Sequence, residues 1–369
     1  MVPREQAAPA RADPRSLADV TRSVLRLASA RGGDGRGHRP RVLVLSDGTS
    51  VLSRGALGVE AVRPILERKC AVIERATAMS AFPLALAPAG SGEHVRALEL
   101  LRSNYDAILM VDIAAPRCFE LRRLLDGGPV DCPVLHDDEE GTAAMAAAVV
   151  LTAVARTGRK LGELCVVVVG AGAAGTGTAR LLHDLGAGEL RVVDSAGIVR
   201  PGRAGLTGEK TELAALAGPY GPAGSVRDAL RGADVCVGLS GAPIGAADLA
   251  GMNAGPVIIP LSYPDVEVGA EDAAALDAVY LPALEHDLSN NLATPGLLLA
   301  ACELGLRRLS VPDMRAAANR LVSLAEDRPD APPLPRADPV PLARSIADAV
   351  AEGRGRDTMT RWSEGEHER

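Results

Sequence analysis

A glycine-rich turn between a continuous apolar run and a helical segment constrains this fold more than any other feature of the sequence. Residues 164–169 are all apolar, as in a strand that is buried on both faces of a parallel sheet. The chain then runs directly into Gly170-Ala-Gly-Ala-Ala-Gly175 and a predicted helix at Thr176–Leu185. A strand, a tight turn and a helix in this order are typical of a doubly wound, Rossmann-type domain that binds a dinucleotide.

Each glycine of the turn has its own expected role. Gly170 permits the tight turn, Gly172 lets the backbone approach a pyrophosphate, and Gly175 lets the helix pack close to the strand. We expect Ala173 and Ala174 to line the same site, where the N-terminus of the helix favours bound phosphate. The alternative is a glycine-rich turn without a ligand, but the flanking strand and helix favour the dinucleotide site.

An acidic residue follows the next predicted strand, Leu190–Val193. Asp194 lies about 20 residues beyond the last glycine, where such domains place a carboxylate on the adenosine ribose hydroxyls. Because its charge would repel a ribose 2′-phosphate, Asp194 favours NAD over NADP. Arg191 and Arg200 lie nearby in the sequence and blur this preference, and an ordinary turn carboxylate is the alternative interpretation.

The rest of the chain alternates short apolar runs with helical periodicity, which predicts an α/β fold in two domains with mainly parallel sheets. Further strands are expected at Val42–Leu45, Ala71–Ile73, Ala107–Val111, Val235–Leu239, Val257–Leu261 and Ala278–Leu281. Helices are expected around Gly58–Arg68, Gly92–Leu101 and Gly141–Arg156. The predicted boundaries are 1–40 for a flexible N-terminal arm, 41–140 and 141–325 for the two domains, and 326–369 for a proline-rich connector, a docking helix at about 342–352 and a loose tail.

Composition limits the partners of the chain. Of 369 residues, 47% are hydrophobic and 24% are charged, and the net charge is −7. No apolar run reaches the ~18 residues that a membrane span needs, and the absence of a basic cluster disfavours nucleic acid. No apolar secretory segment stands at the N-terminus, so a cytoplasmic location is expected. The six cysteines lack metal or redox spacing and are expected to be reduced core thiols.

A series of short motifs occurs in the order found in bacterial malic enzymes. They are Ser46-Asp-Gly-Thr49, Glu67-Arg-Lys69, Ala81-Phe-Pro83, Asp112-Ile-Ala-Ala-Pro-Arg-Cys-Phe-Glu120, His136-Asp-Asp-Glu-Glu-Gly-Thr142, the glycine turn and Asn290-Asn291. From about residue 41 to 310 the chain therefore resembles that family. Malic enzymes oxidise malate with NAD(P) and decarboxylate the metal-bound oxaloacetate to an enolate, which is protonated to pyruvate. The resemblance implies an N-terminal substrate and metal domain, an active cleft beside the NAD-binding domain, and a homodimer or a higher homo-oligomer.

The resemblance implies that Lys69 is the base for the C2 hydroxyl proton and that Asp137 orients and charges it. Lys69 is one of three lysines among 40 basic residues. Arginine keeps its proton near neutrality whereas a desolvated lysine can release it, which is a physical reason to retain lysine here. A surface lysine is the alternative interpretation.

The resemblance also places metal ligands at Asp112 and Asp138, whose carboxylate oxygens suit Mg²⁺ or Mn²⁺. The family has a Glu before the first of these residues, where this chain has Val111. Metal binding is therefore expected to be weak unless Glu139 or Glu140 supplies the missing ligand. The alternative for this acidic pair is a solvated helix start favoured by the helix dipole.

Two further positions depart from the family pattern. The proton-donating tyrosine of the family precedes the Ser-Asp-Gly-Thr motif, but the first tyrosine here is Tyr105. Tyr263, in place of a family asparagine beside the nicotinamide, is expected to cap the cofactor, reshape the pocket or act as a relocated acid, with packing as the alternative. Asn290 and Ser240 are assigned to the cofactor side, and Asn291 to the substrate carboxylate.

The sequence thus predicts a malic-enzyme-like oxidoreductase that oxidises malate or a related 2-hydroxy acid, with decarboxylation. The expected cofactors are NAD, with NADP less favoured, and Mg²⁺ or Mn²⁺. Loss of the family's Glu and Tyr keeps two alternatives open, a 2-hydroxy-acid dehydrogenase that does not decarboxylate and a non-catalytic dinucleotide-binding paralogue. The expected partners are a small-molecule substrate and a second copy of the chain, without nucleic acid or membrane.

Overall fold

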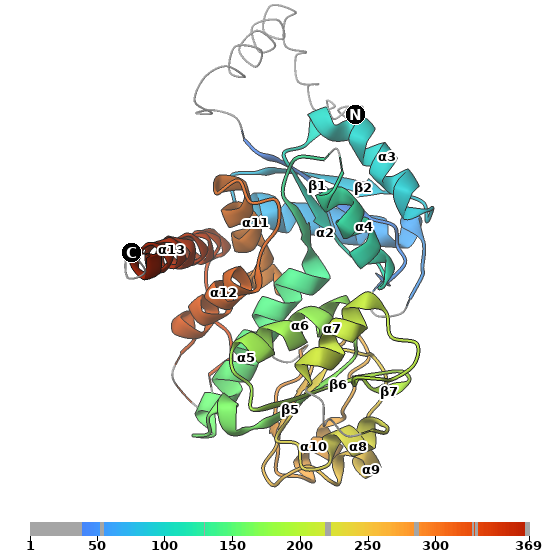
Figure 1. Cartoon of the computed structure of the whole chain (residues 1–369), viewed down its shortest axis with the longest axis vertical. Coiled ribbons are helices and arrows are strands. Elements are labelled where there is room, and N and C mark those ends of the chain that lie inside the picture. Colours follow the sequence, from blue (N-terminus) through green and yellow to red (C-terminus); the bar gives the residue numbers. More distant parts are fainter. Residues whose placement is uncertain are drawn as a thin grey trace, which may run out of the picture. The chain divides into compact units, whose positions relative to one another are not determined.

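The computed structural model describes residues 39–51, 55–128, 130–217, 223–283, 288–326, 328 and 331–365, and only the backbone of 356–365. From Pro40 onward the chain forms one unit that contains two sheets (Figure 1). The mainly parallel strands of both sheets confirm the predicted α/β class. The predicted arm at 1–40 lies outside the described residues except for its last two.

Four parallel strands form the first sheet, in the order β2-β1-β3-β4. The strands are β1 (Arg41–Ser46), β2 (Ser80–Ala85), β3 (Ala107–Met110) and β4 (Val134–His136), and the helices around them are α2 (Val59–Ala76), α3 (Ser91–Leu101) and α4 (Arg117–Asp126), with a short turn η2 (Arg102–Asn104). In β1, Val42 and Val44 share a core with α2, whereas Leu43 and Leu45 share one with α3 and α4. Burial on both faces explains why these strands are continuous apolar runs.

The strand predicted at Ala71–Ile73 is wrong, because these residues lie inside α2. The buried positions of this helix recur every three or four residues, as the helical period requires. They are Val62, Leu66, Lys69, Cys70, Ile73 and Ala76. The second strand of the chain is instead β2, which carries the Ala81-Phe-Pro83 motif, and the helical period places Lys69 on the buried face of α2.

Six strands form the second sheet, in the order β10-β9-β8-β5-β6-β7, parallel except for β7. They are β5 (Cys165–Val169), β6 (Glu189–Asp194), β7 (Gly197–Ile198), β8 (Val235–Gly238), β9 (Val257–Pro260) and β10 (Val279–Tyr280). The helices of this region are α5 (Thr142–Arg156), α6 (Ala173–Asp184), α7 (Gly208–Leu216), α8 (Val226–Leu230), α9 (Ala246–Leu249) and α10 (Ala270–Ala274), with a turn η4 (Leu161–Glu163). Strand β5 lies between β6 and β8, at the switch point where doubly wound sheets bind ligands.

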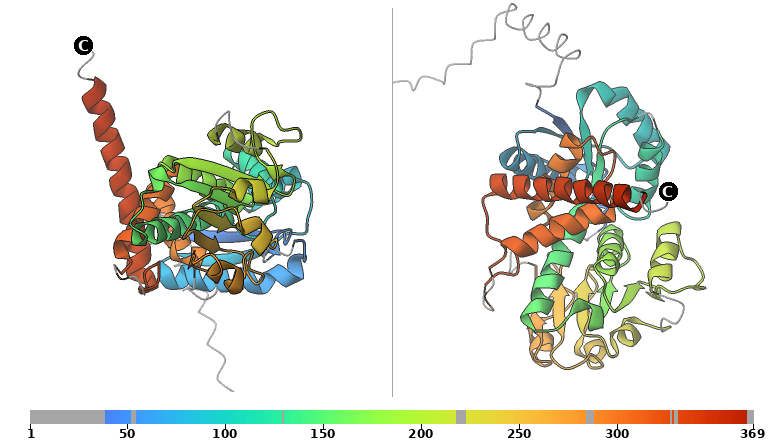
Figure 2. Two further views of the ribbon diagram at one scale, coloured as in Figure 1. Left: turned by 90° about the horizontal axis from the view of Figure 1, so that it is seen from below. Right: turned by 60° about the vertical axis from the view of Figure 1, so that its left-hand side comes forward.

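Three C-terminal helices complete the unit (Figure 2). They are α11 (Thr294–Glu303), α12 (Val311–Leu324) and α13 (Pro339–Gly365), and a short turn η5 (Asn290–Leu292) precedes them. Helix α13 packs along α11 and α12, in the region where a docking helix is expected. Its bounds are wider than 342–352, and the tail predicted to be loose from 354 continues as helix to Gly365.

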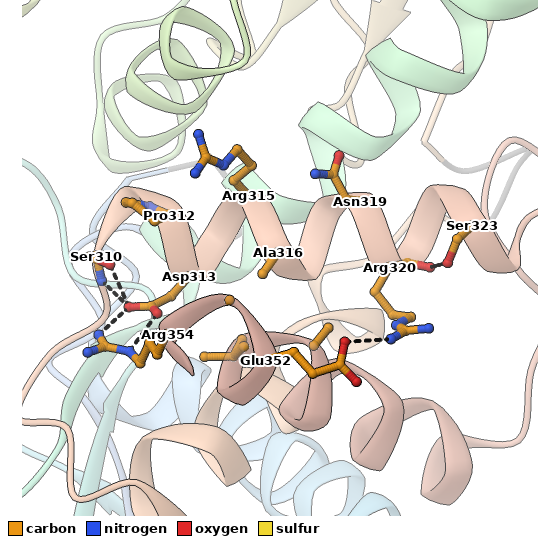
Figure 3. A pocket seen from close by; sticks show the side chains of 13 residues that line it. Ser310, Pro312, Asp313, Arg315, Ala316, Asn319, Arg320, Ser323, Glu352 and Arg354 are labelled. Carbon is orange, nitrogen blue, oxygen red and sulfur yellow. Dashed lines mark hydrogen bonds and ion pairs between the residues drawn. The ribbon is translucent and has the colours of Figure 1, made fainter. Parts of the chain in front are cut away.

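Ion pairs join α12 to α13 (Figure 3). The buried carboxylate of Asp313 accepts hydrogen bonds from Ser310 N at 2.7 Å and from Nε and Nη2 of Arg354 at 2.8 and 2.6 Å. Arg320 lies 3.8 Å from Glu352. A hollow of about 650 Å³ lies beside these residues. It shares no lining residue with the cavity that contains Asp137 or with the cavity that contains Asp194.

The six cysteines are free thiols and four of them are buried, as predicted. No helix of the described ranges has the length and apolar character to cross a membrane.

Candidate active site

Acidic residues follow three neighbouring strands of the first sheet. Asp47 comes directly after β1, Asp112 two residues after β3, and Asp137 and Asp138 directly after β4. Because the carboxyl ends of parallel strands meet at one edge of a sheet, these carboxylates gather there. The last three line a cavity of about 550 Å³ together with Gly172 from the turn after β5. The cavity therefore joins the carboxyl edges of the two sheets.

Lys69 is the centre of a closed hydrogen-bond network in this cavity. Its Nζ lies 2.7 Å from Asp137 Oδ2 and donates to Asn290 Oδ1 at 3.1 Å and to Asn291 Oδ1 at 2.5 Å. Asp137 also accepts from Asn290 Nδ2 at 2.9 Å and from Thr294 Oγ1 at 2.6 Å. The interpretation of Lys69 as a surface lysine is wrong, because the residue is only 8% exposed. Thr294 was not predicted, since a lone threonine at a helix start carries no signal.

Asp112 and Asp138 face each other across the loops that follow β3 and β4. The N–H of Asp112 donates to Asp138 Oδ2 at 3.0 Å, and Ser50 N donates to the carbonyl of Asp112 at 3.0 Å. Asp112 has a φ of 53°, a region that non-glycine residues seldom adopt. These backbone contacts hold the two carboxylates in one place.

The Asp112–Asp138 pair is suited to a divalent cation. Asp112 Oδ2 is buried without a hydrogen-bond partner. Burial and the facing Asp138 raise the pKa of Asp112, and burial and the neighbouring Asp137 raise the pKa of Asp138. A cation would stabilise both as carboxylates. No group of three or more His, Cys, Asp or Glu ligands occurs among the described residues, so water and substrate oxygens would have to complete the metal shell.

Within the part of the chain that the structure describes, no third carboxylate joins this pair. Val111 lines the cavity. Glu139 and Glu140 are buried against Arg122, and Glu139 also lies 3.0 Å from Arg180. Neither glutamate lines the cavity, so the suggestion that one of them replaces the missing ligand does not hold here, and the alternative of a solvated helix start is wrong.

The glycine turn lines a second cavity of about 1060 Å³, which lies along the edge of the second sheet. Gly170 has a φ of 118°, and a Cβ on Gly175 would collide with its carbonyl oxygen. A Cβ on Gly172 would meet no protein atom within 4 Å, which leaves the backbone open to a ligand. Gly172 lines both cavities, and Ala173 and Ala174 line the first. The turn therefore has the shape that a bound pyrophosphate requires.

Two predicted cofactor contacts lie on loops that a buried carboxylate connects. Ser240 lines the second cavity, and Tyr263, which is 48% exposed, lines the first. Glu267 accepts from Ser240 N at 2.8 Å and from the hydroxyl of Ser262. It thus joins the loops after β8 and β9. Glu267 was not predicted, because a single glutamate between valines carries no recognisable spacing.

Asp194 lines the second cavity as predicted, but its carboxylate is not free. Arg203 donates to it at 2.8 and 2.5 Å, and Lys210 Nζ donates at 2.6 Å. Burial alone would raise the pKa of Asp194, but these hydrogen bonds lower it to about 2. Two cations therefore neutralise the charge on which the expected repulsion of a 2′-phosphate rests, and the preference for NAD over NADP stays a prediction.

Comparisons with known proteins place this geometry in a family. Residues 140–280 match the family model described as malic enzyme, NAD binding domain. The bifunctional malic/malolactic enzyme of Bacillus subtilis (strain 168) is 31% identical over 324 residues, which cover 86% of this chain and 78% of the relative. The chain belongs to the malic enzyme family.

Further malic enzymes show the same likeness. The NADP-dependent malic enzyme of Rhizobium meliloti (strain 1021) is 31% identical over 299 residues, which cover 78% of this chain but only 39% of the relative. The crystal structure of an NAD-dependent malic enzyme from Thermotoga maritima matches with a TM-score of 0.79 and 28% identity, over 94% of this chain and 95% of that chain. The resemblance and the Rossmann-type NAD-binding domain are thereby confirmed, and the relatives include both NAD- and NADP-dependent oxidoreductases.

Proposed function

We propose that the protein catalyses the oxidative decarboxylation of malate to pyruvate with a nicotinamide dinucleotide and a divalent cation. The observation that carries this proposal is the network of Lys69, Asp137 and Asn290, which shares one cavity with Asp112 and Asp138. The open glycine turn borders the same cavity. A proton acceptor, a pair of metal ligands and a dinucleotide site therefore meet where one small substrate can reach all three.

Lys69 takes the proton of the substrate hydroxyl at Nζ when C2 is oxidised. A nicotinamide bound in the cavity would accept the hydride. Asp137, 2.7 Å away, stabilises the ammonium that forms. The amide oxygens of Asn290 and Asn291 orient Nζ. A divalent cation held by Asp112 and Asp138 would supply Lewis-acid polarisation of the substrate carbonyl.

The anionic substrate also needs a positively charged partner. Arg68 precedes the catalytic lysine, is exposed, and lines the same cavity. A guanidinium binds a carboxylate through two parallel hydrogen bonds. We assign Arg68 to one carboxylate of malate, beside the predicted contact from Asn291.

The test is a panel of 2-hydroxy acids with NAD or NADP, with and without Mn²⁺, in which reduced cofactor and CO₂ are measured in parallel. We expect malate with Mn²⁺ to give equal amounts of both products. Reduced cofactor without CO₂ would instead indicate a dehydrogenase. Neither product, despite dinucleotide binding, would indicate a non-catalytic paralogue.

The proposal extends to assembly, location and domains. We propose a homodimer in the cytoplasm, supported by the family and by six free thiols, which fit a reducing compartment. The domain boundaries at 41–140 and 141–325 are supported by the two sheets, which fall on either side of residue 140. Sedimentation equilibrium should give twice the chain mass of 38.0 kDa, and a monomer would contradict the assembly.

A further inference from the structure

One end of the second cavity is lined by charged and hydroxyl side chains that the proposed mechanism does not use. This end, which we call the ribose end, consists of Asp194, Ser195, Arg200, Arg203, Thr207 and Lys210. It lies beyond the carboxyl end of β6, next to the strand that carries the glycine turn. Because the adenosine ribose of a bound dinucleotide lies beyond this strand, these side chains would meet the ribose and its substituents.

Asp194 has no acceptor capacity left for the ribose hydroxyls. Its Oδ1 accepts from Ala196 N at 2.9 Å and from Arg203 Nη1 at 2.8 Å. Its Oδ2 accepts from Arg203 Nη2 at 2.5 Å and from Lys210 Nζ at 2.6 Å. A carboxylate has about four lone-pair sites, and all four are used. The residue that would mark an NAD site therefore serves to hold two cations.

Lys210 and Arg200 keep donors for a ligand. Lys210 is 27% exposed at its side chain, and its contact with Asp194 uses one of three ammonium N–H groups. Among the described residues, the Arg200 guanidinium has one weak contact, with the carbonyl of the next residue at 3.5 Å. Both side chains line the cavity. The ribose end therefore offers unused positively charged donors.

The remaining charges at this end are already balanced. Arg203 is fixed by Asp194 and by the carbonyls of Gly197 and Ile198, at 2.9 and 3.2 Å. Glu209, the other acid of this cavity, is paired with Arg123. Arg200, Arg203 and Lys210 consequently share one carboxylate, that of Asp194, so the ribose end has an excess of positive charge.

We propose that the ribose end binds a phosphate monoester on the 2′ position of the adenosine ribose, with Lys210 and Arg200 as its ligands, so that the protein accepts NADP at least as well as NAD. A 2′-phosphate uses charge-assisted hydrogen bonds that a neutral 2′-hydroxyl cannot make. The inference deepens the proposed function by naming the form of the cofactor. It depends on the proposed function in one respect, namely that a nicotinamide dinucleotide binds in this cavity.

The first experiment is calorimetric titration of the full chain with NADP and with NAD. We expect NADP to bind as tightly as NAD or more tightly. Lys210→Gln should weaken NADP binding by about 10- to 100-fold and leave NAD affinity unchanged or tighter, because Asp194 regains an acceptor site. Arg200→Gln, which breaks no ion pair among the described residues, should act in the same direction. Lys160→Gln, on an 83% exposed lysine away from both cavities, is the matched control.

Two results would overturn the inference. One is several-fold tighter binding of NAD than of NADP by the unaltered protein. The other is an equal loss of both dinucleotides in Lys210→Gln and none in Arg200→Gln, which would show a structural role alone. Titration with 2′-AMP and 5′-AMP separates this inference from the proposed function, since preferred binding of 2′-AMP supports the subsite even where malate is not turned over. Malate turnover with NAD preferred would contradict the subsite alone.

Discussion

Replacement of Lys69 by arginine separates proton transfer from charge. Arginine keeps the positive charge beside Asp137 but cannot accept a proton at working pH. Lys69 borders a cavity of about 550 Å³, so the larger guanidinium has room there. We expect Lys69→Arg to lose most of the turnover while the protein stays folded and binds its dinucleotide.

The expected loss follows from the role of the residue. A general base contributes about 10²- to 10⁴-fold, which corresponds to roughly 3–5 kcal/mol of activation free energy. Lys69→Ala should lose as much turnover and also stability, because it leaves the buried Asp137 without its cation. Breaking such a pair costs about 3–5 kcal/mol. Asn290 and Thr294 still donate to Asp137, so we expect a stability loss at the lower end of that range.

The assay measures initial rates of cofactor reduction at saturating malate and Mn²⁺, with thermal unfolding and dinucleotide titration of each variant. Lys160→Arg is the matched control, because the Lys160 side chain is 83% exposed and lies 3.9 Å from Glu163 at the surface. Near-normal turnover of Lys69→Arg would refute the reasoning. Lys69 would then act as an electrostatic clamp, and the proposed mechanism would need a different base.

Three further predictions concern the metal and the substrate. Val111→Glu should tighten Mn²⁺ binding by about tenfold or more, because it adds a third carboxylate to the pair; an unchanged dissociation constant would show that residue 111 does not reach the cation. Mn²⁺ affinity should rise from pH 6 to pH 8, since the raised pKa values of Asp112 and Asp138 keep protons on the pair at the lower pH and the cation must displace them; a pH-independent constant would contradict this. Arg68→Gln should raise the KM for malate about tenfold, through loss of a charge-assisted hydrogen bond, with dinucleotide affinity unchanged; an equal effect of Arg63→Gln, on the exposed face of the same helix, would argue against a specific contact.

Much of the second sheet could be predicted from the sequence. Strands that are buried on both faces are continuous apolar runs, and glycines mark the turn after β5, so β5 and its neighbours are easy to recognise. The first sheet was harder. Ala71–Ile73 is an apolar triplet that fits a strand and a helix equally well, and only the buried positions one turn away decide for the helix. Strand β4 has three residues, too few for a periodic signal, although it carries the acidic motif of the site.

Within the site, the sequence identified the acids and one of their cations, Lys69, but not the cations that the fold brings to Asp194. The pairing of Lys69 with Asp137 followed from matching motifs. The pairing of Asp194 with Arg203 and Lys210 depends on how the chain returns from β7 through α7, which no spacing rule describes. The sequence therefore showed which residues of the site are polar, but it did not show how their charges are paired.

The π-helical turn η3 (Asp137–Gly141) contributes several residues of the site from one short motif. Its first two carboxylates line the cavity, and its next two are held by Arg122 from α4 and Arg180 from α6. At its end, a Cβ on Gly141 would collide with Thr294 Oγ1, the hydroxyl that donates to Asp137. The buried glutamates thus connect the turn to α6, the helix that follows the Gly170–Gly175 turn. The small size of Gly141 leaves room for the Thr294 hydroxyl, which donates to Asp137 in addition to Asn290 and Lys69. Glu139 and Glu140, which the sequence suggests as metal ligands, instead fix the orientation of the two carboxylates beside them.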